Sequence, residues 1–221
     1  MPLRLSLSPD DLASYLAAQI SHVLPERLVE GREVRPALDD ALERMEHCVG
    51  RLRQRYHHDD QGARFDHRHT DQYAMLLYLT SNAAFKRGDV ALAAQAYALN
   101  KALHGLDAFY EVELPSVFAF QHPVGTVLGR AHYADYFFVY QRCSVGSSLE
   151  GQTPRFGEGV VMFGGSAVIG DVTIGSNVWL SVNATLMAGH IPDDSVVFGA
   201  TPDIMVKPTT RNVRRDLFRA G

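Results

Sequence analysis

The sequence predicts an α+β protein in which an N-terminal α-helical bundle is followed by a parallel β-helix. Two observations lead to this prediction: apolar stripes at helical spacing in the first half of the 221-residue chain, and a six-residue repeat in the second half. The repeat fills residues 156–191, which read FGEGVV MFGGSA VIGDVT IGSNVW LSVNAT LMAGHI. We expect residues 1–107 to form the helical domain, residues 108–206 the β-helix and residues 207–221 a basic C-terminal tail.

Each block of the repeat opens on a bulky apolar residue, and the fifth place of most blocks is small or β-branched. The first places hold Phe156, Met162, Val168, Ile174, Leu180 and Leu186, and the fifth places include Val160, Ser166, Val172, Val178 and Ala184. A period of six fits neither the α-helix, with about 3.6 residues per turn, nor the alternation of a half-buried strand. It fits a solenoid in which three blocks make one triangular coil. The first residue of each block then points into a narrow core.

Composition and charge exclude several classes of protein. The net charge of −4 and the pI near 6.2 argue against a general affinity for nucleic acid or for anionic membranes. No stretch approaches the roughly 20 apolar residues that a membrane span needs, and the N-terminus turns polar too soon for a secretory signal. Cys48 and Cys143 are too few for a disulfide framework. We therefore expect a soluble cytoplasmic protein with neither a nucleic-acid partner nor a membrane.

The first half carries the start and stop signals of several helices. Ser8 before Pro9 and two aspartates is typical of a helix start, and Gly88 followed by Asp89 indicates one helix end and the next N-cap. The expected helices begin near residue 9 and cover residues 35–56, 72–86 and 89–106. The stripe of the second runs Leu38, Leu42, Met45, Val49, Leu52 and Tyr56, the spacing of a helix packed on other helices.

Residues 57–71 are rich in histidine and aspartate, with four of each. Such side chains suit zinc or similar ions, so a metal site is one interpretation. The helical pair of histidines four residues apart with a nearby base is absent, however. We therefore expect a solvated loop between helices and no metal.

The second half contains two interruptions of the repeat. Residues 146–155 break the period and predict a loop extruded from one corner of the solenoid, and residues 195–206 predict a last coil or strand. The tail beyond Lys207 contains several arginines. We expect a solvated or helical terminus there, with phosphate binding as the alternative.

His122 is the residue in the repeat region best suited to acid–base chemistry. It stands immediately before a proline in FAFQHPVGTVLG, and at a coil edge its imidazole is suited to act as a general base near neutral pH. A carboxylate on the other ring nitrogen fixes the tautomer of such a base. Glu113 is the nearest upstream candidate for that role and Glu111 the second. The alternative is a structural histidine in a strand.

Four segments resemble the serine acetyltransferase branch of the hexapeptide acyltransferases. They are HPVGTVLGRA, VYQRCSVG, TPRFGEGVVMFGGSAVIGD and IPDDSVVFGATP, and the resemblance is strongest over residues 121–202. It implies an N-terminal helical domain and left-handed coils, an exception to the usual right-handed crossover. It also places His122 on the family's catalytic base, which takes a proton from an acceptor hydroxyl as that hydroxyl attacks acetyl-CoA. Glu113 matches the aspartate that orients this base.

The resemblance implies further site residues. Gly146, Gly164 and Val182 would line the groove that holds pantetheine, and Lys207 would meet the phosphates of CoA. Gln121 stands where the family has an aspartate before the base. Thr153 stands where the family has a second active-site histidine, so these two residues would contact the acceptor. The interval from Glu113 to His122 is also six residues shorter than in the family.

The resulting functional hypothesis is a CoA-dependent O-acetyltransferase with acetyl-CoA as co-substrate and no metal. The acceptor is a small polar hydroxyl compound, either L-serine or a sugar. The second hypothesis is a catalytically silent assembly or regulatory protein that retains the scaffold. The resemblance further implies a homotrimer or a dimer of trimers.

Overall fold

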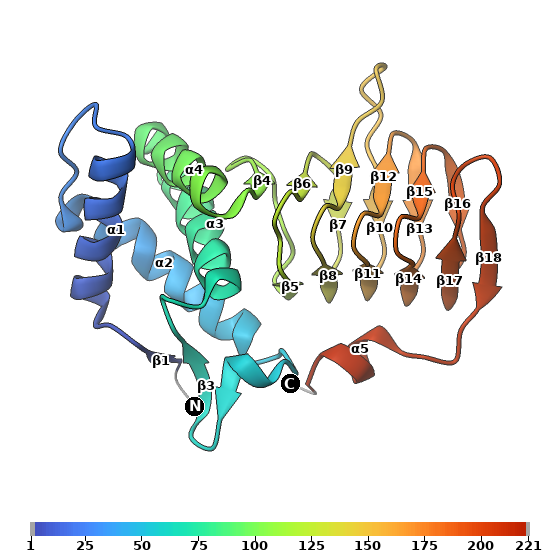
Figure 1. The fold of residues 1–221 in the computed structure, drawn as a ribbon, viewed down its shortest axis with the longest axis horizontal. Helices are drawn as coiled ribbons and strands as arrows, with labels where there is room; N and C mark the ends of the chain where they lie inside the picture. The colour runs from blue at the N-terminus through green and yellow to red at the C-terminus, as the bar shows by residue number, and fades with distance from the viewer. Residues whose placement is uncertain (1–2, 220–221) are drawn as a thin grey trace.

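The structure, a computed structural model, describes residues 3–219 and joins a helical N-terminal part to a long three-sided coil of short strands (Figure 1). Among the described residues, four helices make up most of the N-terminal part. They are α1 (Pro9–Val23), α2 (Gly31–Val49), α3 (Thr70–Lys86) and α4 (Val90–His104). Each packs on its neighbour in the chain, and α1 also contacts α4.

The predicted N-caps of α1 and α4 are present. The Ser8 hydroxyl accepts a hydrogen bond from the backbone N–H of Asp11 at 3.1 Å, and the Asp89 carboxylate accepts one from the N–H of Leu92 at 3.0 Å. Each bond satisfies one of the backbone donors that a helix start leaves free. Gly88, with φ of +82°, lies in the turn between α3 and α4.

The predicted bounds of the second helix, residues 35–56, are wrong at both ends. Helix α2 begins at Gly31 because Glu30 and Glu33 form a capping box, in which the N–H of Glu30 donates to the Glu33 carboxylate at 2.8 Å. The helix ends at Val49. Leu52, assigned to the stripe, instead forms an isolated β-bridge with Phe218 near the other end of the chain.

The histidine-rich segment is part of a small sheet rather than a solvated loop. Strand β3 (Gly62–Phe65) pairs with β1 (Arg4–Leu5) on one side and with β2 (His58–Asp59) on the other, and the short 3₁₀ helix η1 (Arg55–His57) precedes β2. His57 is buried, with 3% of its surface exposed. This sheet brings the segment against the N-terminal end of α3, as Figure 1 shows for β3.

The second part of the chain winds through three sheets in turn. One sheet has the order β4, β6, β9, β12, β15; the second β5, β8, β11, β14, β17, β18; the third β7, β10, β13, β16. Neighbouring strands in all three are parallel, except that β18 is antiparallel to β17. The bounds are β4 (Asp107–Ala108), β5 (Phe118–Phe120), β6 (Val127–Leu128), β7 (His132–Tyr133), β8 (Phe137–Val139), β9 (Ser144–Gly146), β10 (Arg155–Phe156), β11 (Val160–Met162), β12 (Ala167–Ile169), β13 (Val172–Ile174), β14 (Val178–Leu180), β15 (Thr185–Leu186), β16 (Gly189–Ile191), β17 (Ser195–Phe198) and β18 (Met205–Pro208).

The six-residue repeat gives this coil its core. Every first-place residue of the repeat is at most 2% exposed, and the fifth-place residues Val160, Ser166, Val172, Val178 and Ala184 are at most 1% exposed. Each sheet supplies at least one apolar side chain per coil, and β11, for example, supplies both Val160 and Met162, so the core is continuous along the axis. The predicted extruded loop is present between β9 and β10 and projects from the coil (Figure 1).

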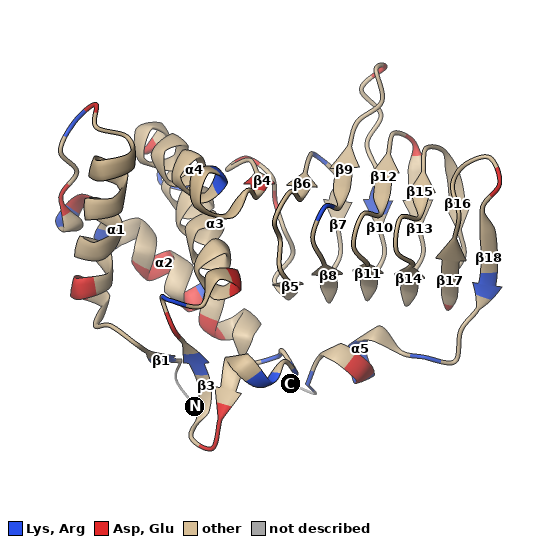
Figure 2. Ribbon diagram, in the orientation of Figure 1, with Lys and Arg blue, Asp and Glu red and all other residues tan. Residues whose placement is uncertain are grey.

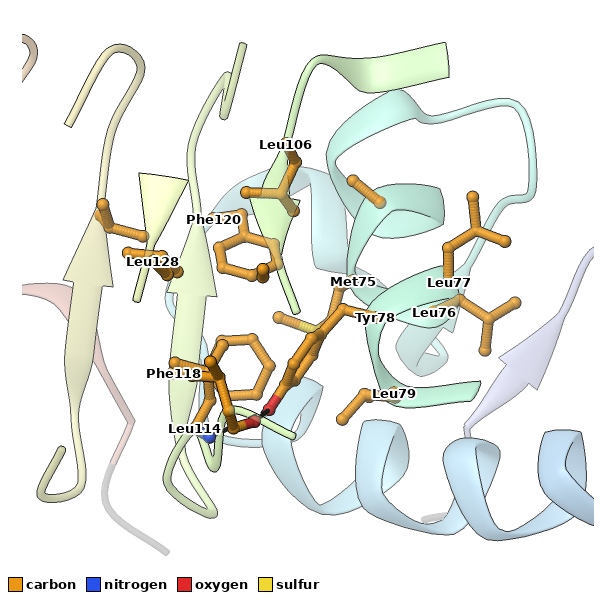
Figure 3. Close-up of a cluster of buried hydrophobic side chains, with 14 of the residues drawn as sticks. Met75, Leu76, Leu77, Tyr78, Leu79, Leu106, Leu114, Phe118, Phe120 and Leu128 are labelled. Atoms are coloured by element: carbon orange, nitrogen blue, oxygen red, sulfur yellow. Dashed lines mark hydrogen bonds between the residues drawn. The ribbon is translucent and has the colours of Figure 1, made fainter. Parts of the chain in front are cut away.

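Helix α3 is held against the first coil by an apolar cluster (Figure 3). The Tyr78 ring packs edge-on against Phe118 and Phe120 of β5, with ring centroids 5.8 and 6.4 Å away. The Tyr78 hydroxyl donates to the Val112 carbonyl at 2.7 Å and accepts from the Leu114 N–H at 2.9 Å. Because a buried phenol needs such partners, these two bonds fix the position of α3 along β5.

The C-terminal tail folds back over the outer face of the β5–β18 sheet. After β18 the chain runs through the short helix α5 (Val213–Leu217) to the helical part, and residues 209–219 are called the strap below. Val213 and Phe218 of the strap are buried in a second apolar cluster, whose other members are Leu52, Val117, Ala119, Tyr136, Phe138, Val161 and Trp179. The outer face of this sheet therefore also carries a buried apolar cluster.

Of the two forms expected for the tail, solvated or helical, the structure has a short helix, α5, and the tail is packed on the coil. Arg211 lies over the Trp179 ring, 5.6 Å from its centroid, and Arg214 lies over Tyr136 at 4.6 Å. Arg214 also pairs with Glu158 at 3.6 Å. These arginines cover the coil's own aromatic rings, an arrangement favoured by the cation–π attraction.

Charged side chains are sparse along the coil and more frequent on the helices and in connecting segments (Figure 2). Within residues 3–219, no helix combines the length and the apolar character required to cross a membrane.

Replacing Phe218 by alanine tests whether the strap is packed. Phe218 is 1% exposed, so Phe218→Ala should lower the free energy of unfolding by about 3–5 kcal/mol, as for other buried phenylalanines. Urea denaturation monitored by circular dichroism measures this change. The control is Arg215→Ala, an exposed neighbour whose loss should cost less than about 0.5 kcal/mol. Equal effects of the two substitutions would show that the strap does not contribute.

Candidate active site

His122 lies in an enlarged corner of the first coil. Six residues, 121–126, separate β5 from β6, whereas four residues separate the corresponding strands in each of the next three coils. His122 has a φ of +52°, a conformation that few non-glycine residues adopt, and 72% of its side chain is exposed. The two additional residues thus let the imidazole project from the coil at a defined point. The backbone just before it is held by a hydrogen bond from the Gln121 N–H to the Val139 carbonyl at 2.9 Å.

Asp71 is the carboxylate that contacts His122. Its Oδ2 lies 3.6 Å from Nδ1 of His122 and accepts a hydrogen bond from the His122 backbone N–H at 3.1 Å. Asp71 is only 6% exposed and is the second residue of α3, where the positive end of the helix dipole favours a negative charge. The buried carboxylate can therefore stabilise a positive charge on the imidazole.

Gln121 and Gln54 approach the other side of the His122 ring. The Gln121 amide nitrogen is 3.1 Å from Nε2 of His122, and the Gln54 side-chain amide donates a hydrogen bond to Oε1 of Gln121. Asp71 thus lies on the Nδ1 side of the imidazole and Gln121 on the Nε2 side. Sequence reasoning selected Gln121 but not Gln54 or Asp71, which come from segments 51 or more residues away along the chain.

The structure does not bring Glu113 to His122. The Glu113 carboxylate pairs with Lys86 at 2.8 Å and accepts from the Asn82 amide at 3.3 Å. Both partners belong to the C-terminal half of α3, and Asn82 lies three turns, about 16 Å, beyond Asp71 along the helix. The expectation that Glu113 orients His122 is therefore wrong in geometry. Glu111, the second candidate, pairs with Arg130 at 3.0 Å.

Gly164 and Val182 lie along the same corner as His122, on later coils. The backbone ladder of this corner connects one coil to the next, from Arg142 N–H to the Val124 carbonyl at 3.0 Å and from Asn183 N–H to the Gly164 carbonyl at 3.1 Å. Val182 is 61% exposed, and Val124 next to His122 is 63% exposed. An accessible edge therefore leads away from the histidine, with exposed Val124 and Val182 beside the polar Arg142 and Asn183.

Lys207 and Gly146 are the other two residues predicted to line the groove. Lys207 belongs to β18, and its Nζ is 6.0 Å from the ring centroid of Phe198, the last residue of β17 before the corner of the fifth coil. Gly146 is the last residue of β9 and so lies at the opposite end of that strand from this corner. Of the four, Gly164 and Val182 share an edge, Lys207 pairs with Val196 within the β17–β18 ladder and approaches that edge only with its Nζ, and Gly146 lies away from it.

Thr153 does not lie beside His122 within one chain. It belongs to the extruded loop between β9 and β10, whereas His122 lies between β5 and β6, at a different corner of the triangle. The chain thus assembles His122, Asp71 and the two glutamines, but leaves Thr153 on another edge.

The histidine-rich segment contains one buried histidine, His57, next to the partly buried His69. The rings of His57 and His69 have centroids 6.0 Å apart, and neither Nδ1 atom has a hydrogen-bond partner among the described residues. Burial, with smaller contributions from His69, His58 and Arg64, lowers the pKa of His57 to about 3. Within residues 3–219, no group of three or more His, Cys, Asp or Glu residues is arranged to hold a metal ion.

Solved structures that resemble this chain are serine acetyltransferases. That from Brucella abortus strain S19 has a TM-score of 0.69 and 15% identity, covering 92% of this chain and 85% of that one. That from Neisseria gonorrhoeae has a TM-score of 0.69 and 15% identity, covering 94% and 85%. A serine acetyltransferase in complex with CoA has a TM-score of 0.68 and 14% identity, covering 89% and 83%. No protein-family model and no curated protein sequence matches the chain.

The chain has a serine acetyltransferase-like fold. Its architecture thus matches the hexapeptide-repeat fold that the resemblance implied. At these identities the likeness establishes the fold, and the chemistry has to be argued from the side chains described above.

The low pKa of His57 predicts a pH-dependent stability. The unfolded chain binds a proton at His57 below about pH 6.5 and the folded chain only near pH 3, so acidification favours unfolding between these values. At pH 5 the contribution is about 2 kcal/mol. We expect the loss of unfolding free energy between pH 7 and pH 5 to shrink by that amount in His57→Leu, measured with urea.

His47→Leu is the control for this experiment, because His47 is an exposed residue of α2. It should leave the difference between the two pH values as in the wild type. The same pH dependence in both variants would contradict the assignment to His57.

Proposed function

We propose that the chain is an acetyl-CoA-dependent O-acetyltransferase that acts on a hydroxyl of a small polar acceptor. The observation behind this proposal is an accessible imidazole, His122, placed against a buried carboxylate, Asp71, at the start of an accessible edge. The fold of the neighbouring structures supports it, and one of them is a complex with CoA. The proposal includes left-handed winding of the coil and a homotrimer or a dimer of trimers, as the resemblance implies.

The proposed reaction is a direct transfer without a covalent enzyme intermediate. Nε2 of His122 takes the proton of the acceptor hydroxyl while the hydroxyl oxygen attacks the thioester carbonyl. As the tetrahedral intermediate collapses, the carbon–sulfur bond breaks and the imidazolium returns the proton to the CoA sulfur. Acetyl ester and free CoA are the products, and His122 is neutral again.

Asp71 stabilises the imidazolium formed during this transfer. The separation of 3.6 Å between Oδ2 and Nδ1 exceeds a hydrogen bond, but the two groups need only a small rotation to close it. The carboxylate is buried and so is weakly screened by solvent, which strengthens its attraction for a positive ring. Asp71 thus takes the orienting role that the resemblance implied for Glu113.

Acetyl-CoA is proposed to lie along the edge that joins His122 to Lys207. Exposed Val124 and Val182 offer apolar contact for the pantetheine chain. The buried Gly164 between them has no side chain that would project from the edge. The corner of the fifth coil, next to Lys207, lies four coils beyond that of His122, about 19 Å at the usual spacing between strands. Lys207 would then meet the phosphates.

The acceptor of the proposed transfer is either L-serine or a sugar. Gln121 offers both a donor and an acceptor of hydrogen bonds to a hydroxyl at His122. Because Thr153 lies on another corner, it takes part in acceptor binding only if a second copy of the chain supplies it.

Substitutions at three residues test the proposed base. His122→Ala should lower acetyl transfer by about 10²–10⁴, the usual contribution of a general base. Asp71→Asn should lower it by about 10- to 100-fold, equivalent to one charge-assisted hydrogen bond. Glu113→Gln should retain the wild-type rate, since its carboxylate lies at the far end of α3. Release of free thiol from acetyl-CoA, with L-serine and with a panel of sugars, measures the rates.

Full activity of His122→Ala would refute the mechanism. Loss of activity in Glu113→Gln but not in Asp71→Asn would return the orienting role to Glu113. Saturation by L-serine alone would identify the acceptor as the amino acid.

Calorimetry with CoA separates the enzyme from a catalytically silent assembly protein. We expect the wild type to bind CoA and Lys207→Gln to bind it about tenfold more weakly, with pantetheine, which lacks the phosphates, unaffected. Arg155→Gln removes the same charge from β10 on another sheet and should bind as the wild type. A chain that binds neither CoA nor pantetheine would favour the silent assembly protein.

A further inference from the structure

Gln54, Gln121 and His122 form a directional chain of hydrogen bonds. A side-chain amide has one oxygen that only accepts and one nitrogen that only donates. Because Gln54 donates to Oε1 of Gln121, the NH₂ group of Gln121 is turned toward His122, 3.1 Å from Nε2. Nε2 must then be the accepting nitrogen of the ring, and the proton of the neutral imidazole resides on Nδ1, on the side of Asp71.

The segment that carries Gln54 is held in place by the strap. The Arg53 N–H donates to the Leu217 carbonyl at 3.0 Å, and the Arg53 guanidinium donates to the Phe218 carbonyl at 2.8 Å. Leu52 forms the β-bridge with Phe218. Gln54 also begins the η1 turn, with a bond from the His57 N–H to its carbonyl at 3.0 Å. Its backbone is therefore fixed on both sides, and its side-chain amide meets Oε1 of Gln121.

The chain of amides has a second direction that fits the protonated ring. An imidazolium donates from both nitrogens, so the NH₂ group of Gln121 cannot remain opposite Nε2. If Gln121 turns over, its oxygen accepts from Nε2–H and its nitrogen faces Gln54. The Gln54 amide must turn over with it, so that its oxygen, which has no hydrogen-bond partner among the described residues, becomes the acceptor. Each direction matches one protonation state of His122.

We propose that Gln54 is a positioning residue that acts through Gln121 to set which nitrogen of His122 carries the proton. The neutral ring keeps its proton on Nδ1 toward Asp71 and presents the lone pair of Nε2. When an acceptor hydroxyl binds there, its O–H donates to Nε2 in place of the Gln121 amide. The Gln121 amide then donates to the hydroxyl oxygen. The consequence for turnover rests on the proposed acetyl transfer, whereas the tautomer is a property of the free protein.

The test is the tautomer of His122 in the full chain labelled with ¹⁵N-histidine. Ring ¹⁵N chemical shifts, recorded at alkaline pH where the ring is neutral and assigned by loss of the signal in His122→Ala, distinguish the Nδ1–H and Nε2–H forms. We expect mainly the Nδ1–H form in the wild type. In Gln54→Glu the carboxylate can only accept, so Gln121 must donate to it and present its oxygen to the ring. The ratio should then shift toward Nε2–H by about two- to tenfold, the effect of one hydrogen bond.

One further variant controls for the charge that Gln54→Glu adds, and another tests the inference independently of whether Gln54→Glu folds. Gln61→Glu places the same charge in the exposed turn between β2 and β3 and should leave the His122 ratio unchanged. Gln121→Met removes the hydrogen bond to Nε2 directly; because Asp71 still faces Nδ1, its ratio should shift toward Nε2–H, but by less than in Gln54→Glu. It tests the inference even if Gln54→Glu fails to fold.

A wild-type ring mainly in the Nε2–H form would overturn the inference, as would a ratio unchanged in both Gln54→Glu and Gln121→Met. The predicted shift in a protein that transfers no acetyl group from acetyl-CoA would support the inference and refute the proposed function.

Discussion

The candidate site depends on the packing of α3 against the first coil. Tyr78 fills the contact with Phe118 and Phe120, and its hydroxyl is bonded to backbone on both sides of Glu113. Because the interior is closely packed, α3 cannot slide along β5 without breaking these contacts. The N-terminal end of the helix is thereby fixed beside the corner of residues 121–126. This places a buried carboxylate at an exposed histidine.

The strap extends the same constraint to the opposite side of the histidine. A parallel coil with one apolar outer face would expose a large patch, and the strap covers that face with Val213 and Phe218. Its end bonds to the chain between α2 and η1, directly before Gln54. The strap thus covers an apolar face and also positions Gln54, so the stability of the protein and the geometry of the site depend on the same segment.

The enlarged corner shows how a regular scaffold acquires a reactive side chain. Four-residue corners keep the coils in register and leave little freedom for the side chains within them. The two extra residues of the first coil release one side chain from the repeat, at the coil nearest the helices. Later corners repeat without interruption and present Gly164 and Val182 as an even edge. The proposed base therefore lies at the first coil of this edge, and the proposed CoA site extends along its later coils.

The sequence by itself determined the coil, because a side chain every six residues must enter the core, and every first-place residue from Phe156 to Leu186 does. It also selected His122 and Gln121 as candidate site residues and predicted the extruded loop and the caps at Ser8 and Asp89, all from local signals. Only the tertiary structure decided the partners of His122. Asp71 reaches His122 across 51 residues of chain and Gln54 reaches Gln121 across 67, and no local pattern encodes which end of α3 meets the corner. Glu113 was nearer in sequence, but the length of a helix separates it from the histidine.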